Sequence, residues 1–391
     1  MRQPPQYLEE RLLLSTIVLV AFGLVMVLSS SFILAERNLG DGYAYFKKQL
    51  LFVAMGLALI LLVRRIPYEL YARLVYPLTF GAILLLCALY LPGFGLRING
   101  ARRWLDFGFF RFQPSEAAKI AMIVYLAHSL TKKADRRHTF TYGFLSHLLL
   151  PGVMLLFIIE EPDFGSVMIM SLVAGVMLFA GGVRIRYLLA AGVAVTPAIV
   201  YLVMAEGYRL RRILVFLDPF KDPLGDGYQI IHSLMSFAAG GTFGVGLGAG
   251  QQKLFFLPDP HTDFIFAIIG EELGLLGVLF VLLLFIAFIR NGLRVARWAP
   301  DPFAGHLAFG LTILIGIEAF VNMGVTLSLL PTKGLPLPFI SYGGSSMLMS
   351  LLAVGILAGI ARRIPTPKRG TYRGKATTPS PFRAGMAGRY R

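Results

Sequence analysis

Apolar residues occur in long blocks along the chain, each roughly 16 to 25 residues, separated by short charged or Gly/Pro-rich stretches. A helix needs about 20 apolar residues to cross the hydrocarbon core of a bilayer. A β-barrel would instead show ten-residue segments that alternate apolar and polar positions, and no such alternation recurs. The pattern therefore predicts an all-α, polytopic integral membrane protein.

Ten blocks are long enough to be read as transmembrane helices. Their expected ranges are 12–34, 49–63, 74–92, 115–131, 143–160, 166–182, 187–204, 263–289, 306–328 and 345–361. The sequence thus divides into an N-terminal segment (1–11), a ten-helix membrane domain (12–361) and a C-terminal tail (362–391). A long loop, 205–262, separates the seventh and eighth helices, and loops of this length are uncommon unless they are functional.

Basic residues set the expected orientation. The chain carries 37 Lys and Arg against 21 Asp and Glu. Most of the basic residues fall on one set of segments if both termini are cytoplasmic, as the positive-inside rule requires. The long loop is then extracytoplasmic. The tail is basic, without acids and rich in Pro, Gly, Ser and Thr, which predicts disorder and attraction to anionic lipid, or a dedicated protein partner. The charge placement gives no reason to expect a nucleic-acid partner.

Composition excludes some chemistry. The single cysteine, Cys87, cannot form an intrachain disulfide or a thiolate metal site. The first apolar block is too long for the core of a cleavable signal peptide.

Within the long loop, residues 230–237 read as an amphipathic helix at the interface. The glycines at 240–250 favour a tight re-entrant turn over a phosphate loop, because no strand precedes them.

Ionisable residues occur near the expected outer ends of several helices. Pro114 suits a first helical turn, and Glu116 and Lys119, three apart, share one helical face. Arg111 is expected one or two turns before Lys119. The pair could simply neutralise itself in the bundle, or the cations could bind an anionic headgroup, which Arg holds bidentately and Lys as a point charge.

Other polar positions raise similar alternatives. Glu160, Glu161 and Asp163 could cap the next helix or bind a cation. Glu318 falls in mid-span, where it needs a partner or a water-filled cavity. The prolines and glycines after Leu330 forbid a regular helix there. This places Lys333, Ser341 and Tyr342 at the mouth of an outward-facing cavity.

The stretch FFLPDPHTDFIFAIIGEELG (255–274) concentrates acids at the outer boundary of the eighth span. Asp263, preceded by His261 and Thr262, is the best candidate for chemistry because it sits where loop becomes helix. The alternative, that Asp263 is only a helix N-cap, is equally open from the residues themselves.

Five motifs resemble the SEDS family of bacterial cell-wall polymerases, which includes FtsW, RodA and SpoVE. They are RRWLDFGFFRFQPSEAAK, EEPDFGS, DPFKDPLGDGYQ, LPDPHTDFIFAIIGEELG and PTKGLPLPFISYGGSS, and the last is closest to the FtsW division branch. The resemblance covers about residues 10–362. It implies a peptidoglycan glycosyltransferase that polymerises lipid II at the outer face of the bacterial inner membrane. It also implies that Asp263 is the essential acid and that Arg111, Lys119, Tyr228 and Gln229 are functional.

The expected chemistry needs one base and several cations. A pyrophosphate-linked donor already has a good leaving group. Asp263 would take the proton of the GlcNAc 4-hydroxyl, and Arg111, Lys119 and Lys333 would stabilise the leaving pyrophosphate, with inversion at the MurNAc anomeric carbon. Glu116, His261, Thr262 and Ser341 complete the candidate substrate-binding set. The spacing shows no metal site, and whether a divalent cation such as Mg²⁺ or Mn²⁺ assists is left open.

Two rival functions remain at this stage: a lipid II flippase, or a noncatalytic scaffold for a transpeptidase. A flippase needs polar residues through the whole membrane depth, whereas here they cluster at the outer side. The resemblance also implies membrane partners: a class B penicillin-binding protein, other divisome proteins and membrane lipids.

Overall fold

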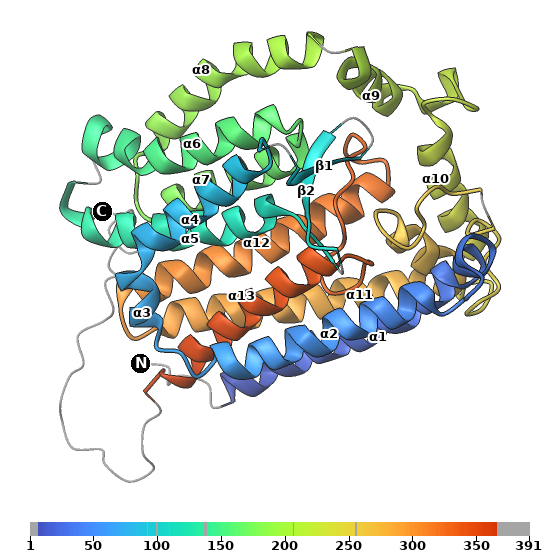
Figure 1. Cartoon of the computed structure of the whole chain (residues 1–391), viewed down its shortest axis with the longest axis horizontal. Coiled ribbons are helices and arrows are strands. Elements are labelled where there is room, and N and C mark those ends of the chain that lie inside the picture. The colour runs from blue at the N-terminus through green and yellow to red at the C-terminus, as the bar shows by residue number, and fades with distance from the viewer. Residues whose placement is uncertain are drawn as a thin grey trace.

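The computed structural model describes residues 7–365 except 92, 99–100, 109, 137–138, 206 and 255. The basic tail expected to be disordered therefore lies almost entirely outside the described residues. The described chain is mainly helical, and its helices pack side by side as a bundle (Figure 1). The α-helices are α1 (Leu8–Leu39), α2 (Ala44–Val63), α3 (Tyr68–Arg73), α4 (Val75–Ala88), α5 (Pro114–Lys132), α6 (Ser146–Glu160), α7 (Phe164–Ala180), α8 (Ile185–Met204), α9 (Gly207–Leu217), α10 (Tyr228–Gly240), α11 (Ile265–Trp298), α12 (Pro302–Thr326) and α13 (Gly344–Arg362).

Each of the ten predicted ranges coincides with one of these helices. Within the described residues, six helical stretches are long and apolar enough to cross a membrane: α1, α2, 141–160, α11, α12 and α13. Helices α4, α7 and the first part of α8 are apolar but shorter. The prediction of a polytopic helical membrane protein is confirmed, while the count of ten crossings stays a prediction.

Helix α5 is one of the ten predicted spans, yet it is not among the six stretches that are long and apolar enough to cross a membrane. It carries Glu116 and Lys119, yet nearly all of its residues are buried. It packs against α4, α12, α7 and α6, so that protein surrounds it on most sides. A helix shielded from lipid can hold charges that a lipid-facing helix could not.

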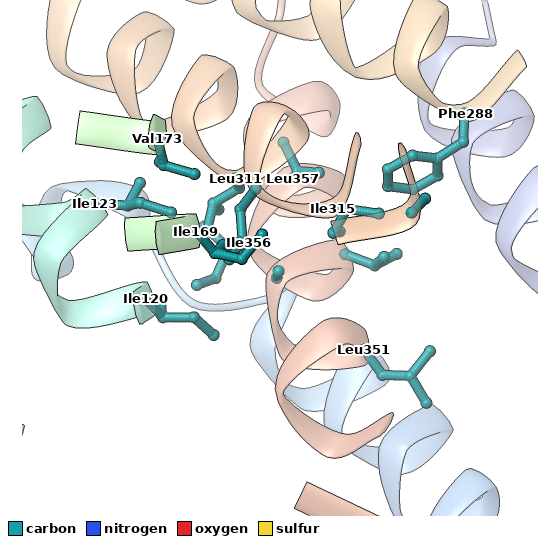
Figure 2. Packing of buried hydrophobic residues seen from close by; sticks show 14 of the residues in the cluster. Ile120, Ile123, Ile169, Val173, Phe288, Leu311, Ile315, Leu351, Ile356 and Leu357 are labelled. Atoms are coloured by element: carbon teal, nitrogen blue, oxygen red, sulfur yellow. The ribbon is translucent and has the colours of Figure 1, made fainter. Parts of the chain in front are cut away.

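The apolar core lies where α5, α7, α12 and α13 meet. Figure 2 shows Ile120 and Ile123 of α5 near Ile169 and Val173 of α7, with Leu311 of α12 between them and α13. Ile123, Ile169 and Leu311 are fully buried. Because interiors are close-packed, this core fixes the relative positions of the helix ends that carry the site.

A small antiparallel sheet was not predicted from the sequence. Its strands β1 (Gly95–Ile98), β2 (Ala101–Asp106) and β3 (Arg111–Phe112) pair in the order β1-β2-β3. The expectation of an all-α chain is corrected to this extent. The placement of Arg111 is corrected too: it lies on β3, paired with Asp106, and not on the helix that carries Lys119.

The long loop between α8 and α11 contains structure of its own. It includes α9, the 3₁₀ turn Pro219–Lys221 and α10, and α10 packs on α11 (Figure 1). The predicted helix at 230–237 is confirmed as part of α10. Helices α8 and α9 make their main contacts with each other, α7 and the following turn, and α8 lies along the outside of the bundle.

The predicted tight turn at 240–250 is confirmed, and glycine is required there. A Cβ on Gly240 would lie 1.9 Å from the carbonyl oxygen of Gly270, and one on Gly244 would lie 2.2 Å from that of Glu272. The N–H groups of Val245 and Gly246 donate to the carbonyls of Glu271 and Glu272. Helix α11 breaks at Gly274 (φ +63°) to accommodate this backbone. The turn is thereby held against the start of α11.

Candidate active site

Two segments distant in sequence form the backbone of the site. The N–H of Tyr342 donates to the carbonyl of His261 over 2.9 Å, and the hydroxyl of Ser341 donates to the carbonyl of Thr262 over 2.6 Å. The buried side chain of Asn322, on α12, donates to the carbonyls of Asp263 and Leu335. Residues 261–263 are therefore held along the irregular segment 327–343, which the prolines and glycines predicted correctly.

The structure assigns Ser341 a clear structural contact. Its hydroxyl also accepts the N–H of Leu337 over 2.8 Å, so it bridges the two segments. Whether it also contacts substrate stays a prediction. Asn322 was missed from sequence because an amide within an apolar helix gives no indication of which backbone it will bond.

Asp263 does not cap α11. The helix begins at Ile265, its N-cap position is Phe264, and no side chain caps it. In the described part of the chain, the Asp263 carboxylate accepts no hydrogen bond. A Cβ added to Gly334 would lie 2.8 Å from Asp263 Oδ2, so the glycine permits the loop to approach the carboxylate. The capping alternative is thereby removed.

The environment of Asp263 suits a base. Burial, together with the negative charge of Asp259, raises the pKa of Asp263 to about 7, against the lowering effect of Arg212. A carboxyl group with this pKa exchanges a proton near neutral pH, as general acid–base catalysis requires. Perturbed pKa values of this kind concentrate at functional sites.

Two cations lie near the Asp263 segment, and of the two Arg212 acts on the carboxylate itself. Lys333, adjacent to Gly334, donates from Nζ to the carbonyl of Phe164 over 3.2 Å, and burial lowers its pKa to about 8. Arg212, on α9, donates to the carbonyl of Thr332 over 3.0 Å. The charge of Arg212 lowers the pKa of both Asp263 and Lys333. Sequence reasoning missed Arg212, since only the fold returns α9 to this loop.

Arg111 lies at the surface near Tyr342, at the C-terminal end of the 327–343 segment. Its Nε is 4.0 Å from an oxygen of Asp106, and its side chain is more than half exposed. The hydroxyl of Ser345, at the start of α13, donates to its carbonyl. The positive charge of Arg111 acts on the phenol of Tyr342, where it opposes the rise in pKa that burial causes. Arg111 is thus available to an anionic ligand at the site's edge.

Lys119 lies inside the bundle. Its ammonium contacts Glu116 over 2.8 Å and also pairs with Glu318, which identifies the partner of Glu318 that the sequence could not name. All three side chains are more than nine-tenths buried. The triad joins α5 to α12. Direct contact of Glu116 or Lys119 with substrate stays a prediction, and it would require one of these pairs to open.

Tyr228 and Gln229 begin α10 and make no described contact with the Asp263 segment. The ring of Tyr228 lies 4.1 Å from that of His232, whose Nδ1 is 2.7 Å from Oε1 of Gln252. Tyr228 thus packs against His232 within α10, and His232 links α10 to the segment that follows the glycine-rich turn. The substrate role of Tyr228 and Gln229 stays a prediction.

Three further acids of the quoted stretches, Glu271, Glu272 and Asp163, make structural contacts. Glu271 accepts the N–H groups of Gln251 and Gln252, while Glu272 accepts Ser29 and pairs with buried Lys253 over 2.6 Å. Their cost of burial is offset by these partners, which tie the glycine-rich turn to α11 and α1. Asp163 caps α7 through the N–H of Ser166, as the capping alternative proposed.

The described chain holds no group of three or more His, Cys, Asp or Glu side chains that could bind a metal ion.

Comparison with known proteins places this geometry in context. The family model described as "Cell cycle protein" (FTSW_RODA_SPOVE) matches residues 10–365. The chain is 46% identical over 353 residues to "Probable peptidoglycan glycosyltransferase FtsW" of Geobacter metallireducens, which covers 90% of this chain and 94% of that protein.

Solved structures agree in fold. A chain described under "Structural coordination of polymerization and crosslinking by a peptidoglycan synthase complex" matches with a TM-score of 0.74 at 28% identity, covering 90% of this chain and 96% of that one. The rod shape determining protein RodA of Thermus thermophilus matches with a TM-score of 0.67 at 25% identity, covering 93% and 97%.

Proposed function

As a member of the cell cycle protein family of FtsW, RodA and SpoVE, this chain is a peptidoglycan glycosyltransferase, and we propose that Asp263 is the base of its transfer reaction. The observation that carries the assignment is the buried Asp263 carboxylate, which accepts no hydrogen bond in the described part of the chain and whose pKa burial raises to about 7 against the charge of Arg212. The substrate is lipid II, and the product is a glycan strand of the septal wall.

The chemistry follows from the charges. Ionised Asp263 takes the proton of the acceptor's GlcNAc 4-hydroxyl as that oxygen attacks the anomeric carbon of the donor's MurNAc. The bond to the pyrophosphate breaks and the configuration inverts. Negative charge then grows on the leaving pyrophosphate, which Lys333 and Arg111 stabilise. A buried, preorganised cation is worth more here than in water.

Lys119 contributes from within the bundle. Its ammonium holds Glu116 and Glu318 together, and so fixes α5 against α12, the helix whose Asn322 positions Asp263. Breaking a buried ion pair by removing one partner is strongly destabilising, which is why the triad can anchor the site.

The remaining features concern placement in the cell. We assign ten crossings, cytoplasmic termini and an active site on the periplasmic side of the inner membrane. The basic segments expected inside support this orientation. We propose a class B penicillin-binding protein as partner, because a structural relative belongs to a peptidoglycan synthase complex. Other divisome proteins and membrane lipids complete the proposed surroundings.

The test is polymerisation of lipid II by the purified protein with its transpeptidase present. We expect glycan strands from the wild type and none from a folded Asp263→Asn variant. A matched control is Asp301→Asn, which changes the same residue type where it caps α12, and where Asn also caps well. Glycan strands made by the Asp263→Asn variant would reject the proposal that Asp263 is the base. No strands from the wild type, with lipid II crossing vesicle bilayers, would indicate a flippase. If the wild type neither makes glycan strands nor moves lipid II across the bilayer, a noncatalytic scaffold is the remaining function.

A further inference from the structure

Three aromatic side chains meet beside the catalytic segment. The ring of His261 lies 4.7 Å from that of Tyr45 and 5.5 Å from that of Tyr342, and the two tyrosine rings are 5.2 Å apart. Tyr45 comes from the first turn of α2, His261 from the segment before α11 and Tyr342 from the segment before α13. We call these three residues the aromatic cluster.

The cluster sits on a fixed base. Gln49, one turn after Tyr45 on α2, donates to the carbonyl of Ser341 and accepts the N–H of Gly343. The N–H of Tyr342 donates to the carbonyl of His261. The side chain of Gln49 and one backbone hydrogen bond thus hold the three rings in place without using their polar atoms.

Those polar atoms are unused within the described chain. Nδ1 of His261 is buried and has no hydrogen-bond partner there. No described residue bonds the phenol oxygens of Tyr45 or Tyr342, and both tyrosines are partly exposed. Burial lowers the pKa of His261 to about 4, so the imidazole is neutral and can accept a hydrogen bond. Buried polar atoms are normally satisfied, so an unused one marks a place for a ligand.

We propose that the aromatic cluster is the subsite for the acceptor's sugar, a hexosamine ring held against Asp263. This inference rests on the proposed function. A sugar has apolar C–H faces and a rim of hydroxyl and amide groups. The cluster presents aromatic faces together with two phenols and an imidazole nitrogen, which is the complementary combination.

The position of the cluster selects the acceptor over the donor. His261 and Asp263 are two residues apart, at most about 7 Å along an extended chain. The sugar beside the base must be the one whose hydroxyl loses its proton, which is the acceptor. Lys333 and Arg212 lie at the opposite end of the paired segments, where the donor's pyrophosphate would leave.

The first measurement is steady-state polymerisation of lipid II by Tyr45 variants with the transpeptidase present. We expect Tyr45→Ala to raise KM about tenfold with a smaller change in kcat, and Tyr45→Phe, which keeps the ring, to recover most of the loss. The matched control is Tyr43→Ala, because Tyr43 belongs to the same turn but packs on Phe32 at 5.2 Å. Equal kinetics for Tyr45→Ala and Tyr43→Ala would overturn the subsite.

The second measurement does not depend on turnover. Asp263→Asn protein is incubated with lipid II that carries a photoreactive diazirine on the acetamido group of its GlcNAc, irradiated, and mapped by mass spectrometry. We expect crosslinks at Tyr45, His261 or Tyr342. Crosslinks confined to other residues would overturn the proposal.

These experiments can reject the acceptor subsite and the proposed function independently of each other. If the wild type polymerises and Asp263→Asn does not, but the cluster takes no crosslink, the subsite is wrong and the function stands. If the cluster crosslinks but the wild type makes no strands, the cluster is a saccharide subsite and the polymerase assignment is wrong.

Discussion

The pH dependence of polymerisation offers the sharpest test of the site. Asp263 must be ionised to accept a proton, and Lys333 must be protonated to hold a phosphate. Their pKa values are about 7 and about 8. The rate should therefore rise through pH 7, fall above pH 8 and form a narrow bell between these limits.

Removing one neighbouring charge should move this bell predictably. Arg212 lowers the pKa of both Asp263 and Lys333, so Arg212→Ala should shift both limbs to higher pH. The variant's rate should therefore fall a few-fold at pH 7, match the wild type near pH 8 and exceed it at higher pH, because both limbs move the same way.

Asp259 provides the opposite perturbation. Its negative charge raises the pKa of Asp263 and does not act on Lys333. Asp259→Asn should therefore lower the acid limb and leave the alkaline limb in place. Asn also tolerates the left-handed backbone of this position (φ +48°).

The assay is the initial rate of lipid II polymerisation between pH 5.5 and 9.5, with the transpeptidase present and the enzyme's fold checked at each pH. Arg212→Lys, which keeps the charge, should retain the wild-type limbs. If Arg212→Ala lowers the rate by the same factor at every pH, then Arg212 does not act through the charges of Asp263 and Lys333, and the electrostatic reasoning fails.

Three further predictions concern stability and folding. The folded-state pKa of Asp263 lies above its ordinary value of 3.8, so the wild type loses stability as pH rises to about 7. Asp263→Asn should therefore melt at a higher temperature than the wild type at pH 8, and the difference should shrink toward pH 5. A lower melting temperature of the variant at pH 8 would contradict this. Lys119→Met should lower the free energy of unfolding by about 3 to 5 kcal/mol, because two carboxylates are left buried without their partner. In chemical denaturation, adding Glu318→Gln to this variant should restore part of the loss. A loss below about 1 kcal/mol, as expected for an exposed ion pair, would refute the triad's role. Gly244→Val should prevent the glycine-rich turn from seating on α11, while Gly192→Val, in open space, should not; limited proteolysis of the loop distinguishes the two.

Local pattern explains how much of the fold was accessible from sequence. Block length and the cost of exposing backbone polar groups to lipid leave helices as the only spanning element here, so each predicted range coincides with a helix. The break after Leu330 followed from proline and glycine alone. The sheet that carries Arg111 was missed because its strands have two to six residues, too few for a periodic signal.

The candidate site divides in the same way. Residue type and the resemblance were enough to select Asp263, since an acid at the entry to an apolar helix stands out. The roles of its neighbours depend on contacts between segments some 50 to 200 residues apart, and no local rule encodes these. Packing of α5 against α12 gave Lys119 two buried carboxylates, whereas the return of α9 to the 327–343 segment brought Arg212 to Asp263. Charges act over a few ångströms in space regardless of separation in sequence, so only the tertiary structure could decide which cations face the reaction and which hold the bundle together.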